Sequence, residues 1–519
     1  MKSQTKRSGS KKRVIFPGRA VVASILQAKG QQQPHLRSQQ QKQSMAAAKA
    51  APMVTDIFKS PPLIKDDLET ATSIAQDETE EICLPYLAGD SADNYNEHGL
   101  PHIHKQKHIA FLHKQLGKLP GAFVAADASR PWFLYWCFNG LRLLGEDISP
   151  YREALIETAR SMQNDTGGFG GGNGQLSHLA TTYAIVLSMA LVGGEDVYKV
   201  VDRRALWKWL CSLKTPGGGF QMATGGEVDV RGAYCAAVIV SLLNLPLDLT
   251  PESPAWTPDH PTLFTKLADY VQRCQTFEGG ISAHPDAEAH GAYAFCALGC
   301  LAILDSPDRI IPRYLNVAKL IFWLSSRQYA PEGGFSGRTN KLVDGCYSHW
   351  VGGCWPLIEA ALGGSAVFSA QSAQRSKLPS YQHSLYSREG LIRYTMCCCQ
   401  DLSKRGGLRD KPGRPSDAYH SCYVLSGLSS AQHKWELATA GPAGTAAAAT
   451  AGGNVDEAKV DEKATAATAA LASWSVSPDL DGVQVFDERD RIVPLHPVYA
   501  IPAECVADIK AYFGAKQGF

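Results

Sequence analysis

The middle of the chain alternates apolar helical stretches with Gly-Gly pairs. Five such pairs, each followed by an apolar residue, stand mostly about 50 to 60 residues apart: Gly167-Gly168-Phe169, Gly218-Gly219-Phe220, Gly279-Gly280-Ile281, Gly333-Gly334-Phe335 and Gly406-Gly407-Leu408. Four of the pairs have a glutamine shortly upstream, and a tyrosine-bearing apolar stretch begins about a dozen residues after each pair. The pattern predicts a repeated unit of helix, Gly-Gly turn and helix.

A unit of this kind has an apolar face that it cannot bury alone, so neighbouring units must stack on one another. The sequence has almost no strand-like alternation and no glycine loop of the nucleotide-binding type. We therefore predict an all-α protein, an α-α toroid (α6/α6 barrel) whose inner helices surround a central cavity.

Composition divides the chain into four predicted parts. Residues 1–62 are basic, Gln-rich and of low complexity, which predicts a disordered tail. Residues 63–437 form the predicted catalytic barrel, residues 438–472 an Ala-rich flexible insertion, and residues 473–519 a segment that closes the barrel. In the barrel, Asp127 or Ser129 is expected to cap the first apolar helix, with Pro131 in its first turn.

Charge, cysteine distribution and the length of apolar runs argue against nucleic-acid binding, a disulfide framework and a membrane span. The 519 residues include 51 basic and 50 acidic side chains, so no overall field favours nucleic acid or a membrane surface. The 14 cysteines are scattered, which does not fit a disulfide framework. The most apolar run, residues 233–247, is too short to span a bilayer or to anchor the chain in one. We therefore expect a soluble, cytoplasmic protein.

Residues 337–350 concentrate groups that bind metals and anions. Two cations, Arg338 and Lys341, stand just ahead of an acid, Asp344, and a thiol, Cys346. At a helix start, the acid and the thiol can turn toward one point. The helix N-terminus is also expected to lower the pKa of the thiol and to favour the thiolate that binds zinc.

Other repeats supply further groups at the start of their second helices, and in a toroid these starts line one mouth of the cavity. His420 can there meet Asp344 and Cys346. One carboxylate, one thiolate and one imidazole leave a coordination position open, as in catalytic zinc sites. A cationic, hydrogen-bonding patch suited to a diphosphate would lie beside them, formed by His290, Arg338, Lys341 and Tyr347.

These residues lie in tracts that resemble the protein prenyltransferase β family, and most closely its farnesyltransferase members. The tracts are residues 127–136, 167–183, 228–235, 278–296, 337–350, 411–427 and 496–499. The resemblance covers most of residues 65–437 and the C-terminal tail. It implies one zinc ion held by Asp344, Cys346 and His420, with a substrate cysteine as the fourth ligand.

The resemblance implies roles for further residues. The isoprenoid diphosphate would be bound, and its leaving group stabilised, by His290, Arg338, Lys341 and Tyr347. Asp410 matches an acid that is linked to Mg²⁺ at the diphosphate. The isoprenoid and peptide pockets would be formed by Ser129, Trp132, Trp136, His178, Arg231, Tyr234, Tyr293, Trp350 and Tyr419.

The implied activity is transfer of a farnesyl group from farnesyl diphosphate to the cysteine of a C-terminal Cys-a-a-X motif, in proteins such as small GTPases. The chain would be the catalytic β subunit of a heterodimer, with an α subunit of helical hairpins. Large aromatic side chains at Trp132 and Tyr234 favour the fifteen-carbon donor, and so does Asp410, because geranylgeranyltransferases of type I have a lysine there. A β subunit of that type is the alternative.

Three positions depart from the family pattern, and two other classes of function were weighed. Thr181, Ala418 and His349 replace a proline, an aromatic residue and a phenylalanine, which leaves the preference for the last peptide residues open. A squalene-type cyclase would need an Asp-x-Asp-Asp run, which the sequence lacks. A binding toroid with structural zinc would need a fourth protein ligand. The histidines between residues 98 and 113 are not expected to form a second metal site.

Overall fold

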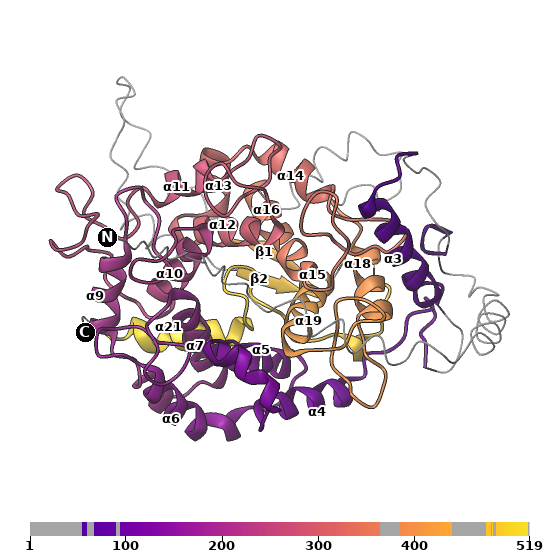
Figure 1. Ribbon diagram of the computed structural model, residues 1–519, viewed down its shortest axis with the longest axis horizontal. Helices are drawn as coiled ribbons and strands as arrows, with labels where there is room; N and C mark the ends of the chain where they lie inside the picture. The colour runs from indigo at the N-terminus through magenta and orange to yellow at the C-terminus, as the bar shows by residue number, and fades with distance from the viewer. Residues whose placement is uncertain are drawn as a thin grey trace, which may run out of the picture. The chain divides into compact units, whose positions relative to one another are not determined.

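Six helical elements form a closed inner ring in the computed structural model (Figure 1). In chain order they are α5 (Arg130–Leu143), α7 (Leu179–Val192), α10 (Val230–Leu242), α12 (Gly291–Leu304), α15 (Tyr347–Trp350) and α19 (Ala418–Gln432). Each packs against the next, and α19 packs back against α5. The α-α toroid predicted from the repeats is therefore confirmed.

The structure describes residues 54, 56–59, 67–89, 94–363, 385–438, 474–478, 480, 484–516 and 518. The predicted tail, residues 1–62, falls almost entirely outside them, and so does the predicted insertion, residues 438–472, apart from its first residue. The four domain limits therefore stay predictions. None of the described helices is both long and apolar enough to cross a membrane.

An outer layer of helices precedes the inner ones along the chain. Its members are α4 (Lys105–Leu116), α6 (Arg152–Met162), α9 (Arg203–Leu213), α11 (Leu267–Arg273), α14 (Val317–Ser325) and α18 (Arg388–Arg393). In α9, Asp202 caps the first turn, and a stripe at helical spacing is buried, formed by Leu206, Trp209, Leu210 and Leu213. Inner helices are apolar on more sides, and in α7 every residue except Ala180 is buried.

The remaining elements are short or lie outside the two layers. They are α3 (Ala71–Leu87), α8 (Glu195–Tyr198), α13 (Pro307–Tyr314), α16 (Trp355–Ala361) and α21 (Ala503–Gly514), with the 3₁₀ helices η2 (Asp56–Phe58), η3 (Gly121–Ser129), η4 (Ser149–Tyr151), η5 (Gly352–Cys354) and η9 (Glu488–Asp490), and the π-helix η7 (Tyr394–Cys398). Strands β1 (Lys434–Leu437) and β2 (Trp474–Ser477) form an antiparallel pair in which Lys434 faces Ser477.

The first glycine of every Gly-Gly turn lies against the backbone of the next outer helix. All five have positive φ, between 69° and 105°. A Cβ atom there would lie only 2.0 to 2.4 Å from a carbonyl oxygen in or beside the first turn of that helix, at Ala205, Lys266, Lys319, Gly390 and Lys107 in turn. Glycine is needed twice over, for the backbone conformation and for the close approach.

The second glycine of each turn lies against an aromatic ring four residues further along the same outer helix. The five rings belong to Trp209, Tyr270, Trp323, Tyr394 and Phe111. The upstream glutamines add side-chain bonds to the same helix starts: Gln275 Oε1, for example, accepts from Asn316 N at 2.8 Å. In the second repeat Lys214 takes this place and donates to Gly218 O at 2.6 Å. The last turn docks on α4, so the docking nearly completes the outer circle.

Helix α5 begins differently from the prediction. Ser129 occupies the N-cap position, but its side chain accepts no capping bond, and Pro131 lies in the first turn as expected. Asp127 does not cap either, because its carboxylate binds Arg130 Nη2 at 2.5 Å and Gln175 Nε2 at 2.7 Å. The prediction of a capping bond from either residue was wrong, because the 3₁₀ helix η3 runs directly into α5.

The C-terminal segment reaches the inner helices. The Tyr135 hydroxyl donates to Ala500 O at 2.9 Å, and the Tyr234 hydroxyl donates to Val498 O at 2.8 Å. These two tyrosines lie on α5 and α10, so residues 498–500 link two helices of the inner ring. They support a closing role for this segment.

We expect Gly218→Ala to destabilise the protein by about 3 kcal/mol or more, because the new methyl group would overlap Lys266 O while the residue keeps a left-handed backbone. The matched control is Gly225→Ala, which has a positive φ of 75° but no atom within 4 Å of its Cβ. It should lose only about 1 kcal/mol. Denaturant unfolding of both variants tests this, and equal losses would contradict the docking argument.

Candidate active site

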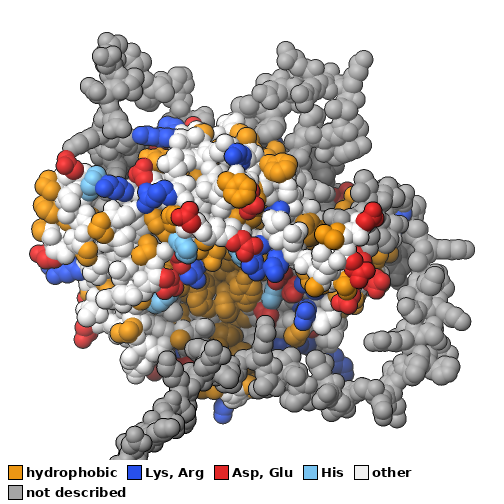
Figure 2. Space-filling view, turned by 45° about the horizontal axis from the view of Figure 1, so that its top comes forward, with side chains coloured by type: hydrophobic (Ala, Val, Ile, Leu, Met, Phe, Trp, Pro, Cys, Tyr) orange, Lys and Arg blue, Asp and Glu red, His pale blue; other side chains and the backbone are white. Residues whose placement is uncertain are grey.

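Two predicted site histidines and the neighbour of a third lie at the starts of inner helices. His178 Nδ1 accepts from Ala180 N at the start of α7, His290 Nδ1 accepts from Ala292 N at the start of α12, and Asp417 caps α19. Figure 2 shows a hollow lined by hydrophobic side chains, with charged and histidine side chains on its rim. Several helix N-termini therefore face one mouth, where their dipoles favour negative charge.

Aromatic side chains form a continuous belt around the inside of the ring. Each ring centroid lies between 4.4 and 6.0 Å from the next, in the order Trp136, Trp132, Tyr183, Tyr234, Phe295, Trp350, Tyr423, Tyr419 and back to Trp136. The sequence analysis did not assign three members of the belt, Tyr183, Phe295 and Tyr423, to the site. Two of them could have been found from the sequence, because Tyr183 and Tyr423 occupy the tyrosine position that recurs in each repeat.

Asp344, Cys346 and His420 bring one oxygen, one sulfur and one nitrogen together within 4.8 Å of one another. Asp344 Oδ1 accepts from Cys346 N at 2.8 Å, so both side chains leave the start of α15 together. His420 comes from the first turn of α19, and its Nε2 lies 3.2 Å from Asp344 Oδ1. Residues from two repeats therefore meet, as the toroid predicts.

Asp417 orients the imidazole of His420. Its Oδ2 lies 2.7 Å from His420 Nδ1, while its Oδ1 accepts from His420 N at 2.7 Å. With Nδ1 bound in this way, Nε2 is the atom directed at Asp344. A carboxylate behind a histidine ligand is typical of metal sites. The sequence analysis missed this role, although an acid three residues before a histidine at a helix start was a usable signal.

The charged groups of this cluster shift one another's pKa values. Burial would lower the pKa of His420, but Asp344 and Asp417 together raise it to about 10. Burial would likewise raise the pKa of Asp344, yet the contact with His420 and the Cys346 N–H keep it below its usual value. His420 and Asp344 therefore stabilise each other's charged forms.

The predicted lowering of the Cys346 pKa was wrong. Burial, and then the charge of Asp344, raise the pKa of this thiol well above its usual value. The helix behind it is only four residues long, so its dipole is too weak to compensate. The thiol would become a thiolate only when a metal ion supplies the positive charge.

The donor set fits a metal ion. His420 Nε2 is buried and makes no well-formed hydrogen bond among the described residues, although it is aimed at Asp344. Sulfur, nitrogen and carboxylate oxygen together match the ligand chemistry of zinc better than that of magnesium or calcium. Three protein donors leave one coordination position open.

The predicted diphosphate patch is only partly cationic. His290 uses Nδ1 to cap α12, and burial and then Arg338 lower its pKa to about 4, so it is neutral, with its proton on Nε2. That nitrogen lies 3.1 Å from the Tyr347 hydroxyl. Arg338 Nη1 donates to Glu288 at 2.9 Å, and Lys341 is exposed. His290 is therefore a neutral hydrogen-bond donor beside two cations, Arg338 and Lys341.

Other predicted residues lie around this centre. Arg231 forms an ion pair with Asp229 at the start of α10, and the Tyr293 ring lies 5.1 Å from that of His290. Trp350 Nε1 donates to the Tyr419 hydroxyl at 3.1 Å, and Trp350 lies on the helix that begins directly after Cys346, so the aromatic belt adjoins the cluster of candidate metal ligands. Asp410 lies close enough to Asp344 for that charge to raise its pKa, although burial is the larger cause.

The histidines near residue 100 do not gather into one cluster. His108 lies 3.0 Å from Gln400 Oε1, and His113 lies 2.7 Å from the Tyr151 hydroxyl. His102 does meet two acids from the far end of the chain, with its Nδ1 2.7 Å from Asp490 and 3.8 Å from Asp487. Arg489 contacts its other ring nitrogen, so a cation already faces this group.

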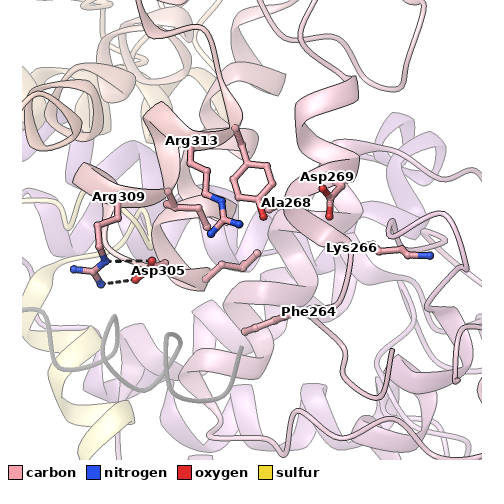
Figure 3. A pocket seen from close by; sticks show the side chains of 10 residues that line it. Phe264, Lys266, Ala268, Asp269, Asp305, Arg309 and Arg313 are labelled. Atoms are coloured by element: carbon pink, nitrogen blue, oxygen red, sulfur yellow. Dashed lines mark hydrogen bonds and ion pairs between the residues drawn. The ribbon is translucent and has the colours of Figure 1, made fainter. Parts of the chain in front are cut away.

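A separate cavity of about 190 Å³ lies between α11, α12 and α13 (Figure 3). Leu304 lines it at the end of α12, whereas His290 stands at the start of that helix. None of the predicted site residues lines this cavity, and its Arg309 is paired with Asp305. It is not part of the site at the mouth.

Comparison with known proteins identifies relatives over most of the chain. A family model described as the prenyltransferase alpha-alpha toroid domain matches residues 103–501. The β subunit of protein farnesyltransferase from Pyricularia oryzae is 58% identical over 472 residues, which cover 90% of this chain and 85% of that protein. The β subunit of geranylgeranyl transferase type 1 from Arabidopsis thaliana is 27% identical over 403 residues, covering 70% and 93%.

A solved structure supports the fold. Candida albicans protein geranylgeranyltransferase-I complexed with GGPP matches with a TM-score of 0.53 and 18% identity, over 79% of this chain and 98% of that chain. At this identity the likeness concerns the toroid alone.

Proposed function

The chain belongs to the protein prenyltransferases, as a farnesyltransferase β subunit, and on that premise we propose that it catalyses zinc-dependent farnesyl transfer to the cysteine of a Cys-a-a-X motif. The observation that carries the proposal is that a cluster of candidate metal donors lies next to an apolar, aromatic cavity wall. The three donors of Asp344, Cys346 and His420 lie at the mouth, and Trp350, four residues after Cys346, belongs to the aromatic belt. A thiol and an isoprenoid chain would thus be bound side by side.

The polar rim suits the diphosphate of the donor. Arg338 and Lys341 carry the positive charges, and His290 and Tyr347 offer hydrogen bonds at the N-terminus of α12. These groups would act on the oxygen atoms where negative charge grows as diphosphate leaves. Asp410 is the acid we propose for Mg²⁺ at the same diphosphate, because its carboxyl is close enough to Asp344 for the two charges to interact.

Zinc held by Asp344, Cys346 and His420 would supply the positive charge that keeps the substrate thiol ionised near neutral pH. Asp417 holds the imidazole of His420 with Nε2 toward the ion. The Tyr419 hydroxyl, which accepts from Trp350, lies close enough to the Cys346 thiol for the two groups to interact. The chain therefore binds and orients the two reactants, and no protein group has to remove a proton in the transfer itself.

The aromatic belt suggests which length of isoprenoid donor the cavity accepts. Tyr234 is buried and its hydroxyl is tied to Val498 O, so the ring cannot swing out of the cavity. The Trp132 ring stacks on that of Trp136, and its centroid lies 6.0 Å from the centroid of the Tyr183 ring. These fixed aromatic side chains leave less depth for a longer chain, which favours farnesyl over geranylgeranyl diphosphate.

The proposal includes partners and a compartment. As a β subunit, the chain would work with a prenyltransferase α subunit and would modify proteins that end in Cys-a-a-X, such as small GTPases. All 14 cysteines are buried free thiols, which supports a reducing compartment, and we propose the cytoplasm.

We expect the purified complex with the α subunit to contain about one zinc ion per β subunit and Cys346→Ala to lose most of it. Cys354→Ala is the matched control, because Cys354 is another buried free thiol eight residues further along the chain. Elemental analysis of the two variants decides the assignment. Zinc retained in Cys346→Ala at the wild-type level would show that the ligand set is wrong.

Zinc affinity should rise with pH. In the metal-free protein, His420 has a pKa of about 10 and Cys346 one above its usual value, so both are protonated near neutral pH. Binding must displace both protons, and the affinity should therefore increase by about two logarithmic units per pH unit between pH 6 and 8. Competition with a chromophoric chelator measures the slope, after correction for the chelator. A flat profile would exclude this charge state.

The test of function is transfer to a Cys-a-a-X peptide by the chain co-expressed with the α subunit. Farnesyl diphosphate should be used at least about tenfold more efficiently than geranylgeranyl diphosphate, because the tyrosine and tryptophan side chains shorten the cavity. Mg²⁺ should accelerate the reaction. Mass spectrometry should locate the farnesyl group on the cysteine, and a peptide with serine in its place should stay unmodified. Absence of transfer, or preference for the longer donor, would refute the proposal.

A further inference from the structure

Lys411 carries a buried ammonium group next to the acid that we propose for Mg²⁺. Its side chain is 7% exposed, and its Nζ lies 2.5 Å from Asp410 Oδ1. Asp410 and Asp344 are close enough for their charges to interact. Lys411 therefore offsets the repulsion between two neighbouring carboxylates as long as no metal ion does so.

Glu332 is a second acid on which the charge of Lys411 acts. It lies in the fourth Gly-Gly turn and is fully buried. Its Oε1 accepts from Gln76 Nε2 at 2.7 Å, but its Oε2 has no hydrogen-bond partner among the described residues. Burial raises the pKa of Glu332 to about 7, and the charge of Lys411 acts in the opposite direction. A buried carboxylate oxygen without a partner is a place that a cation would stabilise.

Helix α3 holds Glu332 in position. Gln76 donates both to Glu332 and to Glu80, the latter at 3.1 Å, and the charge of Glu80 also acts on Glu332. The helix packs against η7, and its Tyr86 ring lies under the guanidinium of Arg409. Because α3 precedes residue 103, where the toroid match begins, this acidic pocket is built in part by a segment outside the matched domain.

Hydrogen bonds hold the main chain at Asp410 in place, so any change in the pairing of the Lys411 ammonium would come from movement of its side chain. Its carbonyl oxygen accepts from Gly345 N and from the Tyr394 hydroxyl, both at 2.9 Å, and from the Cys399 thiol at 3.6 Å. The ammonium of Lys411 sits on a flexible four-carbon stem. It is paired with Asp410, and its charge also acts on Glu332, so both acids lie within its electrostatic reach.

We propose that Lys411 is a competing counter-ion, which neutralises Asp410 while no metal ion is bound and moves to Glu332 when a divalent cation takes Asp410. The inference rests on the proposed function, which puts Mg²⁺ and diphosphate beside Asp410. The ammonium is paired with a carboxylate in both positions, and no covalent bond changes. Lys411 is thus a positioning residue that sets how much Mg²⁺ the site requires.

Competition for one carboxylate has a measurable consequence. An ammonium group and a divalent cation on Asp410 repel each other, so the presence of one weakens the binding of the other. Removal of the ammonium should strengthen cation binding, whereas removal of its second acceptor should weaken cation binding. The two changes act in opposite directions, which a general loss of packing would not produce.

The experiment measures Mn²⁺ binding by electron paramagnetic resonance in the zinc-loaded complex with the α subunit and bound farnesyl diphosphate. Lys411→Met keeps the length of the side chain without its charge, and we expect it to bind Mn²⁺ about five- to tenfold more tightly than the wild type. Glu332→Gln should bind Mn²⁺ more weakly by a similar factor, because the ammonium then stays on Asp410. Arg414→Gln, an exposed position on the same loop, should match the wild type.

The double variant Lys411→Met/Glu332→Gln gives the sharpest result. Without the Lys411 ammonium, Glu332 has no cation to accept and should no longer affect the Mn²⁺ affinity. The double variant should therefore bind Mn²⁺ like Lys411→Met alone. Lys411→Arg, which keeps the charge, should bind no more tightly than the wild type. Weaker binding by Lys411→Met, or an unchanged affinity in Glu332→Gln, would overturn the proposal.

The same variants separate this inference from the proposed function. In the transfer assay, the Mg²⁺ concentration for half-maximal rate should fall in Lys411→Met and rise in Glu332→Gln. Transfer with an unshifted Mg²⁺ response would refute the inference and leave the function standing. The Mn²⁺ titration needs no turnover, so it decides the role of Lys411 even if no transfer is detected.

Discussion

Each turn glycine meets the backbone of the next outer helix so closely that no side chain fits between them. The five contacts share one geometry, a positive φ and a carbonyl oxygen where a Cβ atom would be, and an aromatic ring four residues later covers the second glycine. This contact fixes the angle between successive repeats. The sequence has no Gly-Gly pair between α4 and α6, where η3 leads into α5 without a side-chain cap. One junction of the ring is therefore built differently.

The site is a consequence of that repeated angle. Because the five Gly-Gly junctions share one geometry, the inner helices that they connect begin at the same end of the ring. Leu179 N, Val230 N, Gly291 N and Gly345 N each donate to a carbonyl of the following repeat. The last of these bonds joins the start of α15 to Asp410 O, and so ties two repeats together beside the proposed metal ligands. Residues far apart in sequence thus reach one mouth without long-range strands.

The sequence predicted the features that depend on spacing. The repeats predicted the toroid, and equivalent positions in them brought Asp344, Cys346 and His420 together. It did not predict features that depend on contacts between repeats, such as the place of Phe295 in the aromatic belt between Tyr234 and Trp350. The raised pKa of Cys346 was missed for a related reason. A local argument from the helix dipole cannot foresee how deeply the thiol is buried. The bond between Asp417 and His420 is local, and it was missed although the three-residue spacing was visible in the sequence.

Charges at the mouth are paired before any ligand arrives. Arg338 is bound to Glu288, Arg231 to Asp229, Lys411 to Asp410, and His420 to both Asp344 and Asp417. A ligand must therefore exchange partners, and its affinity reflects only the difference between the new and the old pairings. The exchange matters most for Lys411 and His420, because their side chains are largely buried and an unpaired buried charge is strongly destabilising. It follows that residues such as Glu288, Asp229 and Glu332, which touch no substrate in the proposed reaction, help to set how tightly substrates and metal ions bind.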